Sequence, residues 1–163
     1  MTSGTKAIAI GAAANLFLSL IKFIGGVFGH SIALIADSIH SLSDLVTDVV
    51  VYFSYGVGQL PPDKNHPYGH GRAETIGVTV VGLLIIITGI RVAYESWETI
   101  NQIIDKTPGA IAASIAILSI FIKEGLYHYT INIGKASKSP SLIANAWHHR
   151  SDTISSIAAF VGI

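Results

Sequence analysis

The sequence contains no cysteine and little charge. Without cysteine there can be no disulfide bonds, thiolate metal sites or cysteine nucleophiles, so a metal site must use nitrogen and oxygen ligands. Only 12% of the 163 residues are charged, about half the fraction that is usual in a soluble domain. The 10 basic and 10 acidic side chains balance, which leaves no basic surface of the kind that binds nucleic acid.

The hydrophobic residues make up 50% of the sequence and are gathered into long runs. A helix that crosses a bilayer needs ~20 mainly apolar residues, and five stretches are long enough. The expected helices cover residues 6–28, 31–60, 71–100, 108–130 and 139–163. No internal repeat or interdomain linker is evident. The sequence therefore predicts an all-α, multi-spanning transmembrane helix bundle, with residues 1–163 forming a single transmembrane domain.

Basic residues in the predicted connections indicate the orientation, because lysine and arginine are enriched in cytoplasmic loops. One side of the membrane collects five of them: Lys6, Lys64, Arg72, Lys135 and Lys138. The other side has only Lys106. We therefore expect a cytoplasmic N-terminus, and five spans then place Ile163 on the far side. Because the chain ends within an apolar run, we also expect it to be a piece of a longer protein.

Two predicted spans carry polar residues on one helical face. The second span has Asp37, His40, Ser41, Asp44 and Asp48, and the fifth has Ser141, Asn145, His148, Asp152 and Ser155. Residues three or four apart share a helix face. Ionisable residues within a membrane span are costly and generally mark function. We therefore expect these two helices to face each other across a functional site.

The motif His-xxx-Asp occurs in both stripes, as His40/Asp44 and His148/Asp152. Two such faces supply four ligands, the number that zinc binds in a tetrahedron. The two aspartates would neutralise a divalent cation, and imidazole also suits iron, nickel and copper. His149 is three residues from Asp152 and is an alternative to His148. The alternative is that these residues only form hydrogen bonds between helices. The same spacing of histidine and aspartate in two spans favours a metal site over this alternative.

A second group of metal ligands lies in the predicted loop after the second span. Asp63, His66 and His70 could bind a metal at the membrane surface, or they could be ordinary polar residues of a solvated loop. Elsewhere, Lys22 is expected to reach the interface or to pair with an aspartate of the second span. We expect Lys123 and Glu124, placed near the inner end of the fourth span, to pair with each other or to reach the interface.

Three segments resemble the cation diffusion facilitator family: ADSIHSLSD at residues 36–44, HPYGHGRAE at 66–74 and WHHRSD at 147–152. The resemblance implies a Y- or V-shaped homodimer of six-helix subunits that exchanges cytoplasmic metal for protons by alternating access. It implies a transport site made of His40, Asp44, His148 and Asp152, and so selects His148 over His149. It also matches Asp63, His66 and His70 to a loop site found in some members.

The resemblance implies further properties of the protein. A His-Asp-His-Asp set is similar to that of zinc-preferring members, whereas aspartate at the first position accompanies broader selection. Family members have a sixth helix and usually a cytoplasmic metal-binding domain, so residues 1–163 would hold five of the six helices. The expected location is a bacterial cytoplasmic membrane, and the expected partners are metal, protons, lipid and a second subunit, with no nucleic acid.

The sequence thus predicts a secondary active transporter, not an enzyme, that exports Zn²⁺, with Fe²⁺, Cd²⁺, Co²⁺, Mn²⁺ and Ni²⁺ as other substrates. Metal would enter from the cytoplasm between the second and fifth spans. One alternative is an intramembrane metallohydrolase, which needs an open coordination position and a nearby base. No His-Glu-xx-His motif is present. The other alternative is a passive divalent-cation channel, which favours weak multiple sites over four anchoring ligands.

Overall fold

Five long α-helices and no strands make up the described part of the chain, which in this computed structural model is residues 2–100 and 109–161. The helices are α1 (Ser3–Phe28), α2 (Ile32–Gly58), α3 (Arg72–Ile100), α4 (Ala110–Ala136) and α5 (Pro140–Val161). The predicted all-α bundle is confirmed. Lys106, on which the predicted orientation partly depends, lies outside the described residues.

The helix boundaries follow local sequence signals at most positions. Helix α2 ends at Gly58, shortly before Pro61-Pro62, because proline cannot donate the backbone hydrogen bond that would continue a helix. Helix α4 is longer than predicted and continues beyond Thr130 to Ala136. Its added turn buries Ile131, which belongs to an apolar cluster with Ala146 of α5. Packing against α5 therefore extends α4 beyond the end that the sequence predicts.

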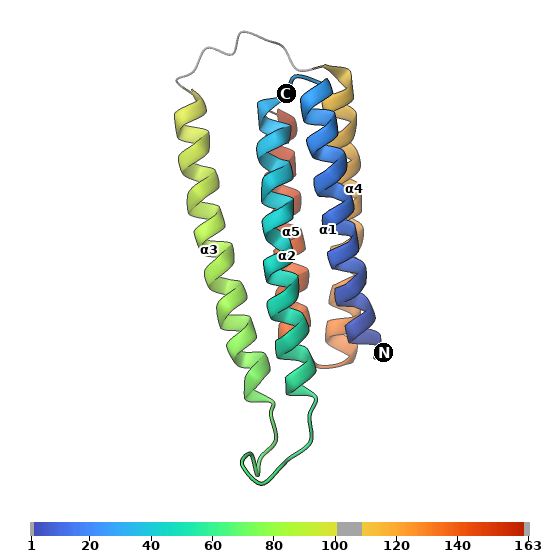
Figure 1. Cartoon of the computed structure of the whole chain (residues 1–163), viewed down its shortest axis with the longest axis vertical. Helices are drawn as coiled ribbons and strands as arrows, with labels where there is room; N and C mark the ends of the chain where they lie inside the picture. The colour runs from blue at the N-terminus through green and yellow to red at the C-terminus, as the bar shows by residue number, and fades with distance from the viewer. Residues whose placement is uncertain (1, 101–108, 162–163) are drawn as a thin grey trace.

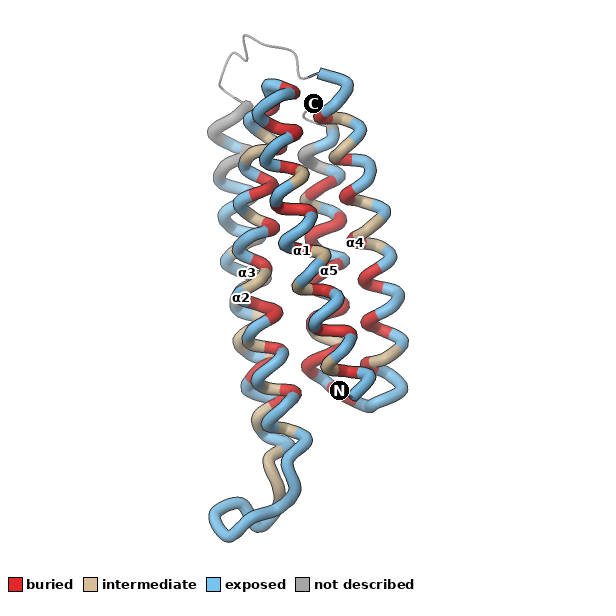
Figure 2. The backbone as a smooth tube through the Cα atoms, turned by 45° about the vertical axis from the view of Figure 1, so that its right-hand side comes forward, coloured by how far each residue is buried: buried red, intermediate tan, exposed pale blue. Residues whose placement is uncertain are grey.

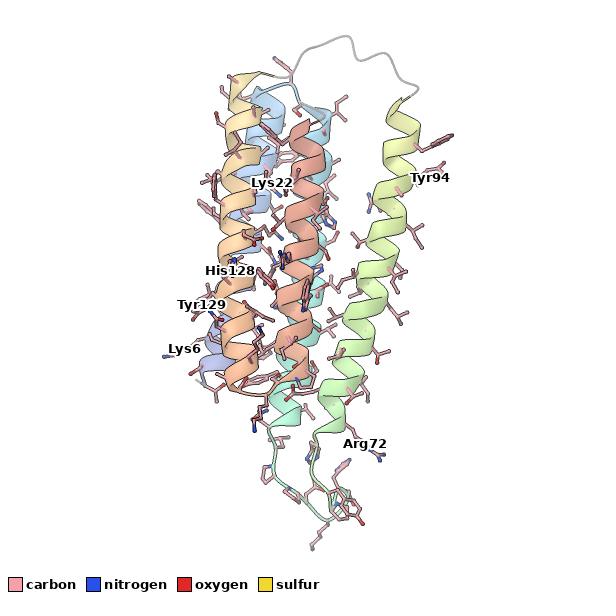
Figure 3. All side chains as sticks on the ribbon, turned by 180° about the vertical axis from the view of Figure 1, so that it is seen from behind. Lys6, Lys22, Arg72, Tyr94, His128 and Tyr129 are labelled. Atoms are coloured by element: carbon pink, nitrogen blue, oxygen red, sulfur yellow. The ribbon has the colours of Figure 1, made fainter. Side chains whose placement is uncertain are left out.

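The helices α1, α2, α4 and α5 form a four-helix group, and α3 packs against α2 and α5 at its edge (Figure 1). The N-terminus, the α2–α3 loop and the α4–α5 turn lie at one end of the bundle, which we call the loop end. Helix α3 starts beside α2 at the loop end and diverges from the other helices toward the opposite end (Figures 1 and 3).

Each helix turns a buried face toward the rest of the bundle (Figure 2), and these faces carry many polar side chains, whereas many exposed side chains are large and apolar, as expected for helices surrounded by lipid. The buried groups include Asn15, Lys22, Asp44, Asp48, Lys123, Asn145, His148 and Asp152. Exposed side chains include Phe17, Phe28, Ile32, Phe53, Ile86 and Phe121. Among the described residues, α1, α3 and α4 contain segments apolar enough to cross a membrane by themselves. Helices α2 and α5 carry the interior polar stripes, which lowers their hydropathy.

The α1–α2 and α4–α5 turns have the same construction. His30 and Lys138 each adopt φ 52°, in the left-handed region that is common just after a helix. The next residue, Ser31 or Ser139, donates its backbone N–H to the carbonyl of a glycine five positions earlier in the chain. In the α1–α2 turn this glycine is Gly26. A Cβ there would lie 2.9 Å from the backbone nitrogen of Ile35, so the close approach of the two helices requires glycine.

These matching turns reveal an internal repeat that the sequence analysis missed. Gly26 and Gly134 are separated by the same number of residues as His40 and His148. Asp44 and Asp152 have this separation too. The α1–α2 turn lies opposite the loop end and the α4–α5 turn lies at it, so the two hairpins run in opposite directions. Inverted repeats of this kind are common in transporters, which place substrate sites where the repeats meet.

Candidate metal centre

The two His-xxx-Asp motifs meet in the middle of the bundle, where α2 and α5 cross. His40 Nε2 lies 3.9 Å from Asp44 Oδ1 and 3.6 Å from Asp152 Oδ1. His148 Nε2 lies 3.4 Å from Asp44 Oδ1 and 3.8 Å from Asp152 Oδ2. Each histidine therefore faces both carboxylates, including the one on the other helix.

The spacing of these atoms suits a small cation. In a tetrahedral zinc site with bonds of 2.0–2.1 Å, neighbouring ligand atoms are about 3.3 Å apart. Each histidine–carboxylate distance here is slightly longer, so a small contraction would bring the atoms to that spacing. Ligand atoms of His40, Asp44 and Asp152 all lie within 4.8 Å of one another, and His148 contacts both carboxylates of this group.

His149, the alternative ligand, lies in a different part of the core. Its Nε2 is 3.5 Å from Asn145 Nδ2, and a Cβ on Gly11 of α1 would lie 3.2 Å from the same Nε2. Asn145 Nδ2 is also 3.4 Å from Asp48 Oδ1, and Asn15 Nδ2 donates to Asp48 Oδ2 at 2.7 Å. The structure thus turns His148 toward Asp44 and Asp152 and turns His149 toward α1.

Lys123 also belongs to the candidate metal centre, although the sequence placed it near the end of its span. It lies in the interior of the bundle with a fully buried side chain, and not near the inner end of its span. Its Nζ donates to Asp44 Oδ2 at 2.8 Å and to Asp152 Oδ2 at 2.7 Å. The predicted pairing with Glu124 is wrong, since Glu124 Oε1 instead faces His128 Nε2 at 3.3 Å. A lysine within an otherwise apolar helix was the available signal.

Lys22 pairs with an aspartate of α2. This is one of the two arrangements that the sequence predicts for it, the other being a side chain that reaches the interface. Its Nζ lies 2.8 Å from Asp37 Oδ2, and both side chains are almost fully buried. The same ammonium donates to Ser41 Oγ at 3.0 Å and to Ser156 Oγ at 3.2 Å. This cluster ties α1 to α2 and α5 on the side of the metal centre away from the loop end.

The α2–α3 loop brings its three predicted ligands together. Asp63 Oδ1 lies 3.1 Å from His66 Nδ1, and Asp63 Oδ2 lies 3.5 Å from His70 Nε2. Ligand atoms of the three residues lie within 4.8 Å of one another. The backbone N–H of His66 donates to Asp63 at 2.7 Å and is the main reason that the pKa of this carboxyl is lowered. The loop reverses at Gly69, whose φ of +81° favours glycine.

Comparison with known proteins identifies the family of this chain. The family model for the cation efflux transmembrane domain matches residues 8–163. The chain belongs to the cation efflux family. This match confirms the resemblance to cation diffusion facilitators that the three sequence segments indicate.

Several curated members of the cation efflux family match almost the whole chain. The chain is 38% identical to metal tolerance protein C1 of Arabidopsis thaliana. The match includes 98% of this chain and 37% of that protein. Over 97% of its length the chain is 39% identical to an uncharacterized transporter of Methanocaldococcus jannaschii, covering 56% of that protein. Over 97% it is 37% identical to the manganese efflux system protein MneP of Bacillus subtilis, covering 53%. The chain thus spans roughly half of these relatives or less.

A cavity of about 270 Å³ leads to the candidate metal centre of this cation efflux domain. It reaches His40, His148 and Asp152 and is lined farther out by residues of α3 and α5, including Thr88 and Ser155. Ser155 is nearer than Asp152 to the C-terminal end of α5, which lies away from the loop end. The cavity therefore approaches the centre from the side of α3.

The loop end is closed by apolar packing and by a buried carboxylate. Ile8, Val51, Tyr55, Val81 and Leu142 form one buried cluster on the loop side of the centre. Glu74 at the start of α3 accepts hydrogen bonds from the hydroxyls of Ser139 and Ser141 and from Gln59 Nε2. This carboxylate lies at the N-terminus of α5, where a negative charge is favoured. The predicted entry route between α2 and α5 from the loop side is therefore filled in this conformation.

Proposed function

We propose that this chain is the membrane domain of a transporter that exports a divalent transition metal, with Zn²⁺ as the preferred substrate. The observation that carries the proposal is the convergence of two His-xxx-Asp motifs from α2 and α5, with histidine–carboxylate distances of 3.4–3.9 Å. The family match and the names of the relatives support metal transport. Two nitrogen and two oxygen ligands fit zinc better than magnesium or calcium, which favour oxygen ligands.

Manganese is the second candidate substrate. Two relatives from Bacillus subtilis, MneP and MneS, carry the name manganese efflux system protein, and the chain is 37% and 36% identical to them. Two carboxylates at the centre would also serve Mn²⁺, which prefers oxygen ligands. The two histidines favour zinc over manganese, so a direct comparison of these ions tests the ligand argument.

The proposed mechanism is proton-coupled alternating access. The metal binds His40, Asp44, His148 and Asp152 in their deprotonated forms, because metal ligands must lose their protons to bind. A conformational change then exposes the centre to the other side of the membrane, where protons displace the ion. Histidine titrates in the pH range that such an exchange uses. Four protein ligands leave no open position for a catalytic water, which argues against a metallohydrolase.

The rest of the proposal concerns the intact protein. The loop end, with the N-terminus and the Asp63/His66/His70 loop, would face the cytoplasm of a bacterial cell. The loop would gather metal before it enters the bundle. A sixth helix and a cytoplasmic domain would complete the subunit, and two subunits would form the transporter. These expectations rest on the family resemblance and on the basic residues at the loop end.

Transport by proteoliposomes that contain the full-length protein tests this proposal. We expect Zn²⁺ uptake that requires a proton gradient and is accompanied by proton movement in the opposite direction. Asp44→Asn and Asp152→Asn should each abolish it, because each removes a ligand charge while keeping the side-chain shape. Mn²⁺ should be carried more slowly. Metal flux that proceeds without a proton gradient and without proton movement would instead identify a channel.

A further inference from the structure

The two aspartates of the metal centre already hold a cation that belongs to the protein. Lys123 of α4 places its ammonium between Asp44 Oδ2 and Asp152 Oδ2, at 2.8 and 2.7 Å. Its side chain has no exposed surface, and the two carboxylates are 2% and 3% exposed. Such short, charge-assisted hydrogen bonds between buried groups are strong. This lysine therefore contacts the same two groups that would bind the transported ion.

The formal charges show why this contact matters for metal binding. With neutral histidines, the two carboxylates and the ammonium together carry a net charge of about −1. A divalent ion beside an unmoved ammonium would leave a net charge of about +1 in a buried site, which is costly. Without the ammonium, the same ion and the two carboxylates would be neutral. Metal and ammonium are therefore alternative partners for this pair of carboxylates.

We propose that Lys123 is an internal competitor of the transported cation, which must displace its ammonium from Asp44 and Asp152 in order to bind. This inference rests on the proposed function and concerns the same centre. Lysine suits the role because its ammonium sits on a flexible four-carbon stem and can move while the helix stays in place. Asp48, one turn beyond Asp44 on the same face of α2, offers the displaced ammonium another carboxylate.

The competition has a functional consequence. A centre of four anchoring ligands would otherwise hold a divalent ion tightly, and tight binding slows release on the far side. When the ammonium returns to the carboxylates, it takes over their charge and helps the ion to leave. Lys123 thus lowers the affinity of the centre and speeds turnover. If Lys123 were only a structural link between α2, α4 and α5, its removal would loosen the ligands and weaken binding.

Calorimetric titration of Zn²⁺ into the detergent-solubilised full-length protein distinguishes these two roles. The loop ligands His66 and His70 are replaced by alanine in every sample, and the part of the Zn²⁺-binding signal that Asp44→Asn removes is assigned to the membrane centre. We expect Lys123→Met to bind Zn²⁺ at least tenfold more tightly and to transport it with a lower maximal rate. Lys123→Arg keeps the charge and can hold both carboxylates at once, so it should bind Zn²⁺ at least tenfold more weakly.

Matched variants make each outcome decisive. Lys22→Met removes another buried, paired lysine and should not tighten Zn²⁺ binding. Equal or weaker binding by a folded Lys123→Met protein overturns the competition. If that variant does not fold, unchanged or tighter binding by Lys123→Arg overturns it instead. Asp44→Asn tests the proposed function separately: if it binds Zn²⁺ as well as the parent does, the metal centre itself is wrong, and the role of Lys123 fails with it.

Discussion

The buried ion pair between Lys22 and Asp37 allows a quantitative test of what holds the polar core together. The atoms Lys22 Nζ and Asp37 Oδ2 are 2.8 Å apart, with side chains 1% and 4% exposed. Removing one partner of a buried pair leaves an uncompensated charge and costs ~3–5 kcal/mol. Polar contacts between membrane helices are worth less, since the unfolded chain finds other partners. We therefore expect Lys22→Met to lower the unfolding free energy by about 3 kcal/mol, near the lower limit for a buried pair.

A double-mutant cycle separates the pair from the packing around it. Replacing both partners, as Lys22→Met with Asp37→Leu, removes both charges and should cost about 1 kcal/mol, because apolar replacement of a whole buried pair is often nearly neutral. The measurement is unfolding of the detergent-solubilised protein by increasing dodecyl sulfate, followed by circular dichroism. A Lys22→Met protein that unfolds like the parent, or a double variant less stable than both single variants, would refute the reasoning.

Further predictions concern the metal sites and the closed end. His40→Asp should raise the ratio of Cd²⁺ to Zn²⁺ transport, since an added oxygen ligand tolerates longer bonds; equal uptake ratios in the two proteins would contradict this. Replacing His66 and His70 together by alanine should lower the metal bound per chain and reduce transport without abolishing it, as metal analysis and uptake assays would show; unchanged metal content would remove the loop site. Because backbone hydrogen bonding lowers the pKa of Asp63, its carboxylate should stay charged, and so remain available as a ligand, at and somewhat below the usual value of ~3.9. Protonation of this carboxyl above that pH, measured by NMR titration, would contradict the hydrogen-bonding argument. Glu74→Ala should lower the unfolding free energy by ~1–3 kcal/mol by leaving buried hydroxyls unpaired, with little change in Zn²⁺ affinity.

The helices were largely predictable because their signals are local. Hydrophobic stretches define where the helices lie, most clearly for α1, α3 and α4, and Pro61-Pro62 stops α2. The His-xxx-Asp spacing places His40 and Asp44 on one face of α2 from helical geometry alone. The extension of α4 to Ala136 was not predictable in this way, because it depends on contacts between Ile131 and α5.

Other features of the centre depend on how distant helices meet. Lys123 is far from both aspartates in the sequence, and its own helix carries no matching acidic stripe. Only the packing of α4 against α5 brings its ammonium to Asp152. The choice between His148 and His149 likewise depends on the rotation of α5 in the bundle. The inverted repeat was missed because it preserves a few turn and ligand positions among otherwise different side chains.

The two inverted hairpins differ in charge at matching positions, and this difference gives the bundle an electrical direction. Asp37 corresponds to Asn145, and Asp48 corresponds to Ser156. On the side away from the loop end, the charge of Asp37 is cancelled by Lys22. Toward the loop end, Asp48 accepts its hydrogen bonds from the neutral amides of Asn15 and Asn145 instead of from an ammonium. The bundle therefore has a lysine-paired carboxylate on one side of the candidate centre and an amide-bound carboxylate on the other, so a cation passing between the two ends would meet two different electrostatic environments.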